Sequence, residues 1–281
     1  MTDLHFKIAS CNLQNLNEHS ATHKLENFIL ALKNELEMPD IIALQEIGSE
    51  AINQDSLAIA NVGFVLSEMI YLATHIQYHY IDIPPIQNST GGAQDFNIRP
   101  AFLIKSDIAI IEKHQIGMNE PAFIGDESLS FKASRYPLVL IIEKEQRQLK
   151  LINCHLKSQN SRTNQEKKLA KKQRNHQAEI IRKYCENSAQ YLPIILLGDF
   201  NDTPNSDTLR ILSAETFISA WTQHQGRLYT TKHRNCPVVI DYILISKNIT
   251  FQNPQVHHIN TNLKHPHRFS DHDPISVDVY L

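Results

Sequence analysis

A strand-helix-strand unit occurs twice in this sequence, and this repetition constrains the fold more than any other feature. In the first copy, "HFKIASCNL" is typical of a strand, residues 22–36 of a helix with Thr22 at its N-cap, and "PDIIALQE" of a buried parallel strand. In the second copy, "LKLINCHL", a charged helix over residues 163–187 and "PIILLGDF" follow in the same order. Such units are common, so their order alone is weak support for a duplication.

The repeat extends to individual residues. "KIASCNL" aligns without gaps on "KLINCHL", and "DIIALQE" aligns on "PIILLGD". In this alignment Asn12 corresponds to His155, and Glu46 corresponds to Asp199. Ligand sites in open α/β sheets lie beyond the carboxyl ends of the strands. We therefore expect two related halves whose polar strand ends meet in one cleft.

Further strands are predicted on both sides of the second copy. They are "IRPAFLIKS", "YPLVLIIEK", "VVIDYILIS" and the end of "RFSDHDPISVDVYL", with loop-like stretches at 84–97 and 117–135. No low-complexity linker divides the chain, and 281 residues are enough for one large α/β unit. We therefore predict a single domain over residues 1–281.

Charge and hydropathy limit the partners and the location. The formal net charge of −3 excludes a uniformly basic nucleic-acid clamp, so any contact with a polyanion must be local. No apolar run approaches the roughly 20 residues of a membrane span, and "MTDLHFKIAS" lacks the features of a signal peptide. These observations favour a cytoplasmic protein without stable membrane association, and they are also compatible with export by a route without a signal peptide. They do not determine the oligomeric state.

The four cysteines have no metal-binding pattern. Cys11, Cys154, Cys185 and Cys236 include no CxxC spacing, which argues against a zinc site, and a structural disulfide is not expected. We predict reduced and mostly buried thiols.

Polar residues stand at the ends of the predicted strands. A carboxylate at the end of a buried strand carries a desolvation cost of several kcal/mol unless a cation or hydrogen bonds compensate it. Oxygen-rich ligands without a cysteine or a closely spaced histidine pair suit Mg²⁺ or Mn²⁺. The strand-end residues are Asn12, Glu46, His155, Asp199, Asn201, Asp241, Asp271 and His272.

Each of these residues also has a structural interpretation. Glu46 or Asp241 could cap a helix or pair with a surface lysine, and His155 could be a satisfied, partly buried histidine. "GDFND" could form an Asx turn, and Asp271 with His272 could lie in a solvated loop. The order of these residue types along the whole chain favours a common site.

The same segments resemble the endonuclease/exonuclease/phosphatase superfamily, which has the deoxyribonuclease I-like fold. The resemblance rests on "CNLQNL", "LQE", "NCHLKS", "GDFND", "IDYILIS" and "SDHDPI", and it covers nearly all of the chain. It implies an α/β four-layer sandwich of two mixed β-sheets flanked by helices, in two pseudo-symmetric halves. It also implies a divalent metal in the cleft between the sheet edges.

The resemblance implies a set of metal-binding residues. Glu46 would hold the metal, Asn12 would help to position metal or phosphate, and Asp271 would offer a second ligand or a water contact. The sequence departs from the family pattern at Gln14, where many members have an aspartate. The amide lacks a charge, so the metal would depend more strongly on Glu46.

The resemblance also implies catalytic roles. Asp199 would align the attacking water or orient its general base, and Asn201 would bind a phosphate oxygen. His272, oriented by Asp241, would contact the scissile phosphate or act as general base. His155 would be a phosphate contact or the acid for the leaving oxygen, and the sequence leaves the acid and base assignments open.

Basic residues are candidate substrate contacts. Arg99 and Arg135 match family positions that often face the phosphate, although either could pair with a structural carboxylate. Lys157 lies beside His155 and begins the basic stretch "KSQNSRTNQEKKLAKKQRNHQ". This stretch is either a solvated helix face or a phosphate track that includes Lys157, Arg162 and Lys168.

Three functions are compatible with these residues. The leading hypothesis is a metal-dependent phosphodiesterase that hydrolyses nucleic acid by in-line attack and, by resemblance to nucleases, leaves a 5′-phosphate. The alternative is a phosphatase or phosphodiesterase for phosphoinositides or other phospholipid headgroups, and the acidic net charge is compatible with it. A binding module without catalysis has only Gln14 in its favour.

Overall fold

The computed structural model describes residues 4–159, 162–188 and 192–281, and these residues form two mixed six-stranded sheets. The first sheet has the order β13(Thr250–Val256), β14(Ile275–Tyr280), β1(His5–Leu16), β2(Ile41–Ile47), β4(Arg99–Lys105), β3(Tyr78–Ile81). The second has the order β5(Ala109–Gln115), β6(Leu138–Lys144), β7(Arg147–His155), β8(Ile194–Asp199), β12(Asp241–Ser246), β9(Phe217–Ser219). A separate hairpin consists of β10(Thr231–His233) and β11(Cys236–Val238).

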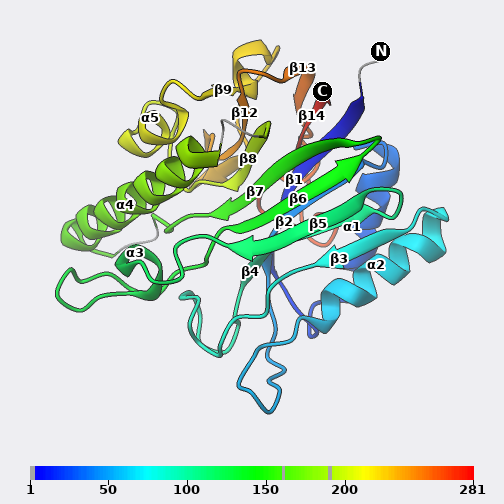
Figure 1. The fold of residues 1–281 in the computed structure, drawn as a ribbon. Coiled ribbons are helices and arrows are strands. Elements are labelled where there is room, and N and C mark those ends of the chain that lie inside the picture. The colour runs from blue at the N-terminus through cyan, green and yellow to red at the C-terminus, as the bar shows by residue number, and fades with distance from the viewer. Residues whose placement is uncertain (1–3, 160–161, 189–191) are drawn as a thin grey trace.

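Helices cover the outer face of each sheet. The first sheet packs against α1(Thr22–Asn34) and α2(Asn61–Thr74). The second packs against α3(Pro121–Ile124), α4(Asn164–Ser188) and α5(Asp207–Ser213), and a short 3₁₀ turn, η1(Ala220–Gln223), follows β9. The predicted four-layer arrangement of helices, two sheets and helices is therefore confirmed (Figure 1). No helix in the described ranges combines the length and apolarity needed to cross a membrane.

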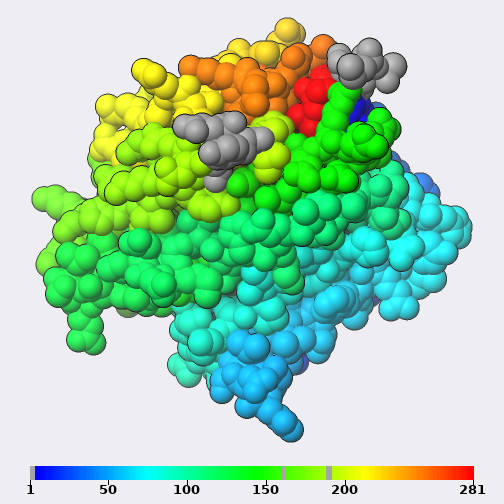
Figure 2. Space-filling model, in the orientation of Figure 1, coloured from blue at the N-terminus to red at the C-terminus, as the bar shows by residue number. Residues whose placement is uncertain are grey.

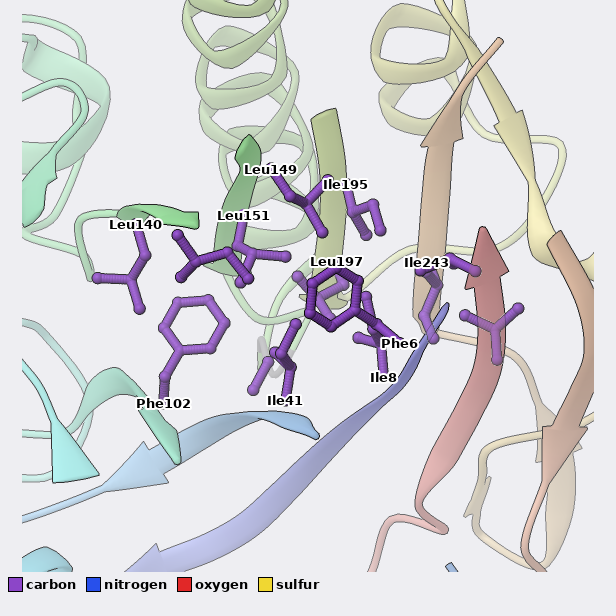
Figure 3. Close-up of a cluster of buried hydrophobic side chains, with 14 of the residues drawn as sticks. Phe6, Ile8, Ile41, Phe102, Leu140, Leu149, Leu151, Ile195, Leu197 and Ile243 are labelled. Atoms are coloured by element: carbon purple, nitrogen blue, oxygen red, sulfur yellow. The ribbon is translucent and has the colours of Figure 1, made fainter. Parts of the chain in front are cut away.

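The centre of the molecule is an apolar core between the two sheets (Figure 3). Side chains alternate along a strand, so every second residue of each strand faces the opposite sheet. Phe6, Ile8 and Phe102 from the first sheet meet Leu151 and Ile243 from the second, and all five are fully buried. This core holds the strand ends of both sheets in a common frame.

The two sheets repeat the same local topology. In the first, β14 is antiparallel to β1, β1 is parallel to β2, and β2 is antiparallel to β4. In the second, β6, β7, β8 and β12 pair in the same sequence of directions. The strand-helix-strand repeat is therefore confirmed as a pair of structurally related halves.

One part of the sequence alignment is wrong by one residue. Ile41 and Ala43 face the inter-sheet core, as do Ile195 and Leu197, so the structural counterpart of Asp199 is Gln45 and not Glu46. An alignment by sequence similarity cannot detect such a slip, although it moves every side chain to the opposite face of the sheet.

A buried amide network joins the sheets near the ends of their central strands. The side-chain amide of Asn153, on β7, donates hydrogen bonds to the carbonyls of Leu44 (2.9 Å) and Ala101 (2.8 Å) in the other sheet. Its oxygen accepts a 2.8 Å hydrogen bond from Gln45 Nε2. Leu44 and Ala101 are the last regular partners of β2 and β4 before their register shifts. Asn153 therefore satisfies backbone groups at the irregular end of the sheet.

The loops at this end extend beyond the sheets. Residues 48–60, which follow β2, project from the lower end of the molecule in the ribbon and space-filling views (Figures 1 and 2). The predicted loop stretch 84–97 contains no strand or helix, whereas 117–135 contains the short helix α3. The carboxyl ends of the central strands therefore lie among irregular segments.

Several local expectations change slightly. The N-cap of α1 is Ala21 without a side-chain hydrogen bond, because Thr22 is already helical, and the helix ends at Asn34. The long charged helix covers Asn164–Ser188, close to the expected range. All four cysteines lie in the described ranges as free thiols, and Cys236 is the exposed one.

The Asn153 network predicts a measurable contribution to stability. Asn153→Leu keeps a similar volume but removes three hydrogen bonds and leaves buried polar groups without partners. We expect the free energy of unfolding to fall by about 3 kcal/mol in urea denaturation. The exposed Asn34→Leu is the control, with an expected change within about 0.5 kcal/mol. Equal stability of the two variants would contradict the proposed role of the network.

Candidate active site

The predicted strand-end residues meet at one place between the two sheets. Glu46 at the end of β2, His155 at the end of β7 and Asp199 at the end of β8 present ligand atoms that all lie within 4.8 Å of one another. Asp199, Asp241 and His272 form a second such group. Asp199 belongs to both groups and is therefore the centre of the site.

Asn12 connects the carboxylates of the two sheets. Its side-chain amide donates to Glu46 Oε1 (3.2 Å) and to Asp199 Oδ2 (3.1 Å), while its oxygen accepts from the backbone N–H of Gln14. In this orientation the amide positions the two carboxylates, and its oxygen accepts a hydrogen bond from the irregular last part of β1.

Left-handed backbone conformations aim the acidic residues into the site. Glu46 has φ 60°, which interrupts the alternation of side chains along β2. Regular alternation would point the Glu46 side chain toward the helices, and this conformation turns it toward the site. Gln14 and Asn15 have φ 47° and 54°, and the N–H of Asn15 donates to Glu46 Oε2 at 2.9 Å. Such conformations cost on the order of 1 kcal/mol or more per residue outside glycine, and they concentrate at functional sites.

The turn after β8 orders Asp199 and Asn201. Asp199 Oδ1 accepts from the N–H of Asn201, and the Asn201 side-chain amide donates to Asp199 Oδ2 and to the carbonyl of Leu156. Gly198 has φ 127°, and a Cβ atom there would lie 2.0 Å from the carbonyl oxygen of Cys154. The glycine in "GDFND" is therefore required by the close approach of β7.

Burial and neighbouring carboxylates raise the pKa of Asp199. Its side chain is 2% exposed, and the charges of Asp241 and Glu46 oppose its ionisation, while His272 acts in the opposite direction. A buried carboxylate with this balance requires a cation nearby or retains a proton at unusually high pH.

The predicted pair of Asp241 and His272 is confirmed as a contact. His272 Nδ1 lies 2.9 Å from Asp241 Oδ2 and 3.1 Å from Oδ1. Burial alone would lower the pKa of His272, but the Asp241 carboxylate raises it well above its usual value. The ring is therefore a cation near neutral pH, and its Nε2 is not used by this pair.

His155 has the opposite electrostatic environment. Its Nε2 lies 3.6 Å from Asp199 Oδ2 and 3.8 Å from Glu46 Oε1, and burial, Arg135 and His272 lower its pKa well below the usual value. Its Nδ1 has no hydrogen-bond partner among the described residues. The site thus combines one neutral and one cationic imidazole.

Arg135 and Lys157 lie on the side of the site formed by the second sheet. Arg135 is buried, donates from Nη2 to the carbonyl of Leu156 (2.7 Å), and its charge interacts with Glu46 and Asp199. Burial, together with the charges of Arg135 and Lys132, lowers the pKa of Lys157 to about 8. Arg135 therefore places a positive charge beside the carboxylates of the site, and Lys157 lies within electrostatic range of Arg135.

Arg99 pairs with a carboxylate, as its structural interpretation predicts. It is 1% exposed, lies 3.4 Å from Asp82 through Nη1, and donates from Nη2 to the carbonyl of Ala58 (2.9 Å). This buried guanidinium joins the segment before α2 to the end of β3, and a contact between Arg99 and phosphate stays a prediction. Asp271 belongs to neither ligand group of the described residues, although its charge interacts with His272 and Lys24.

Three further residues shape the site and were not predicted. Lys24 on α1 donates from Nζ to the carbonyl of Gln14 (2.7 Å), and its charge interacts with Glu46. Thr230 Oγ1 accepts from the N–H of Asp241, and its carbonyl accepts from Asp273. The side-chain amide of Asn260 donates a 2.6 Å hydrogen bond to the carbonyl of His272. No sequence pattern singles out these supporting residues, because their importance arises from tertiary contacts.

The donor set fits a divalent cation. Two carboxylates and a neutral imidazole converge, and the Glu46 side chain is 18% exposed, so the group is accessible from solvent on one side. Carboxylate oxygens suit Mg²⁺ and Mn²⁺, and a neutral imidazole is a common ligand of transition metals. Glu46, His155 and Asp199 are the residues that could hold such an ion.

Comparisons with known proteins agree with this arrangement. A sequence model of the Endonuclease/Exonuclease/phosphatase family matches residues 9–272, and the chain therefore belongs to this family of hydrolases. No curated protein sequence matches it significantly.

Solved structures of low sequence identity share the fold. A family member from Bacteroides thetaiotaomicron superposes with a TM-score of 0.68 at 16% identity, covering 100% of this chain and 99% of the other. The human Nocturnin catalytic domain with bound sulfate gives 0.64 at 18% identity, with coverages of 100% and 97%. D. rerio TDP2 complexed with single strand DNA product gives 0.66 at 16% identity, covering 98% of each chain.

The Asp241 contact predicts a change in the titration of His272. Asp241→Asn removes the negative charge that keeps the imidazolium stable, so the pKa of His272 should fall, and the ring should lose its proton at lower pH. NMR titration of the histidine ring resonances would measure this shift. His258, which contacts Asp273 instead, is the internal reference. An unchanged pKa of His272 would disprove the electrostatic coupling.

Proposed function

We propose that this protein is a metal-dependent phosphodiesterase that hydrolyses nucleic acid by in-line attack of water and leaves a 5′-phosphate. The observation that carries the proposal is the position of Asp199 between two groups. On one side are Glu46 and His155, and on the other are Asp241 and His272. A phosphate between these groups would face a metal site and an imidazolium at the same time.

Nucleic acid is the substrate class that the surroundings favour. Arg135 and Lys157 add positive charge beside the carboxylates, in a protein whose net charge is −3. D. rerio TDP2, which has the same fold, was solved with a single strand DNA product, and Nocturnin was solved with a sulfate anion. These two structures of the same fold, with a DNA product and a sulfate anion, support a phosphate-containing substrate for this chain.

Glu46, Asp199 and His155 would hold the divalent ion, Mg²⁺ or Mn²⁺. When bound, the ion supplies Lewis-acid stabilisation of the phosphoryl oxygens. Asn12 keeps Glu46 and Asp199 at a fixed separation through its two hydrogen bonds. Asp271 contributes through its charge, at the edge of the site where Lys24 also lies.

Asp199 and His272 perform the proton and charge chemistry of the reaction. Asp199 accepts a hydrogen bond from the attacking water and thereby orients it. His272 is protonated, with Asp241 on Nδ1, so Nε2–H can donate to a phosphoryl oxygen. Negative charge that develops on the phosphate is thereby matched by a preorganised cation.

The remaining residues position these groups. Asn201 keeps Asp199 oriented through backbone and side-chain hydrogen bonds, and in the proposed mechanism its amide also binds a phosphate oxygen. Neutral His155 completes the metal-binding group or accepts a hydrogen bond, and Arg135 stabilises the bound phosphate from the second sheet.

A substrate panel tests the proposed activity. Plasmid, single-stranded DNA, RNA and inositol phosphates would be incubated with Mg²⁺, Mn²⁺ or EDTA. We expect metal-dependent cleavage of nucleic acid, and His272→Ala should lower kcat by a factor of about 10² in a variant that remains folded. Release of inorganic phosphate from inositol phosphates with intact nucleic acid would instead identify the alternative phosphatase activity.

Glu46→Gln tests the metal assignment. The substitution preserves volume but removes one negative charge from the site, so the Mg²⁺ concentration that gives half-maximal activity should rise at least tenfold. Activity would be titrated against Mg²⁺ in parallel with Glu50→Gln, an exposed control on the following loop. If the Mg²⁺ midpoint stayed constant while the melting temperature fell, Glu46 would be a structural residue only.

A further inference from the structure

A line of positive charge leads from the active site to the protein surface. Arg135 is buried beside Glu46 and Asp199, Lys157 is half-buried next to it, and Lys132 is exposed. Arg135 donates to the carbonyl of Leu156, the residue before Lys157, and Lys132 lies three residues before Arg135, so the three cations occupy neighbouring positions of the backbone.

Side chains of helix α4 form hydrogen bonds with the backbone of both lysines. Gln173 accepts from the N–H of Lys132 (3.4 Å) and donates to its carbonyl (2.6 Å). Gln177 accepts from the N–H of Lys157 (2.9 Å), and Arg174 donates to its carbonyl (2.8 Å). Residues 173 and 177 are one helical turn apart on the same face, so Lys132 and Lys157 are held as neighbours.

The ammonium groups of these two lysines are available for a ligand. Neither forms an ion pair with a carboxylate of the described residues, unlike Lys171 of the same region, which pairs with Asp207 at 2.7 Å. The acidic residue near Lys132 is Glu166, and its carboxylate accepts from the N–H groups of Arg162 and Thr163 at the start of α4. The Glu166 carboxylate therefore caps the start of α4.

We propose that Lys132 and Lys157 form a subsite for the phosphodiester adjacent to the scissile one, on a single-stranded polynucleotide. The inference rests on the proposed function and adds a substrate feature to it: a backbone phosphate beside the reacting group. Lys157 contacts the substrate closer to Arg135, and Lys132 extends the contact toward solvent. The exposed lysines along α4 itself lie outside this subsite.

Salt dependence provides the test. Each phosphate contact contributes a slope of about −0.7 to the logarithm of affinity against the logarithm of salt concentration for single strands. For the full chain with Mg²⁺, kcat/KM on a single-stranded DNA oligonucleotide would be measured between low and moderate salt. Because both lysines contact one phosphodiester, the combination of Lys132→Gln and Lys157→Gln should make the slope shallower by about 0.7, and Lys132→Gln alone should make it shallower by a smaller amount.

Two controls separate a subsite from general attraction. Lys183→Gln changes an exposed lysine on the distant part of α4 and should leave the slope unchanged. Bis(4-nitrophenyl) phosphate has no adjacent phosphate, so Lys132→Gln should lower the ratio of kcat/KM on the oligonucleotide to that on this ester. Melting temperatures of all variants establish that each is folded.

The outcomes distinguish this inference from the proposed function. A shallower slope for Lys132→Gln, with Lys183→Gln unchanged, supports the subsite. Oligonucleotide cleavage with the same slope in Lys132→Gln overturns the subsite and leaves the proposed activity standing. Absence of metal-dependent cleavage of any nucleic acid overturns the proposed activity and the subsite together.

Discussion

The contact between Asn153 and the opposite sheet is the interaction on which the site geometry depends. An apolar core stabilises two packed sheets through non-directional contacts. The amide of Asn153, in contrast, requires particular carbonyl groups on β2 and β4 and a particular donor on Gln45. Because Glu46 follows Gln45 and His155 follows Asn153 by two residues, this network fixes residues of both sheets against each other.

The irregular end of β2 is as important as the regular part. A strand that continued with ordinary alternation would turn Gln45 toward the inter-sheet space and Glu46 toward the helices. The left-handed conformation of Glu46 brings its carboxylate back to Asn12 and to the N–H of Asn15. Two hydrogen bonds to the carboxylate help to offset the conformational cost, and the strained conformation directs the acidic group into the site.

The sequence predicted most of the chemistry but not the geometry that orders it. Strand ends can be located in the sequence because buried strands are runs of apolar residues, and such a run stops at an acidic residue. The one-residue shift that makes Gln45, and not Glu46, the counterpart of Asp199 cannot be detected from the sequence, because the shifted and unshifted alignments are equally similar. Arg99 could not be separated from Arg135 either, since the difference is the presence of Asp82 beside one of them.

In the basic stretch after β7, most of the buried polar residues that organise the surrounding backbone are uncharged. On α4 the buried polar residues are two glutamines and an arginine paired with Asp202, whereas the helix lysines are exposed. Gln173 and Gln177 also hold the carbonyl of Ala122, so one helix face fixes three backbone segments around the second-sheet side of the site. A protein with an acidic net charge cannot attract a polyanion over its whole surface. It can do so where a rigid framework holds a few cations together, and here amide hydrogen bonds supply that framework.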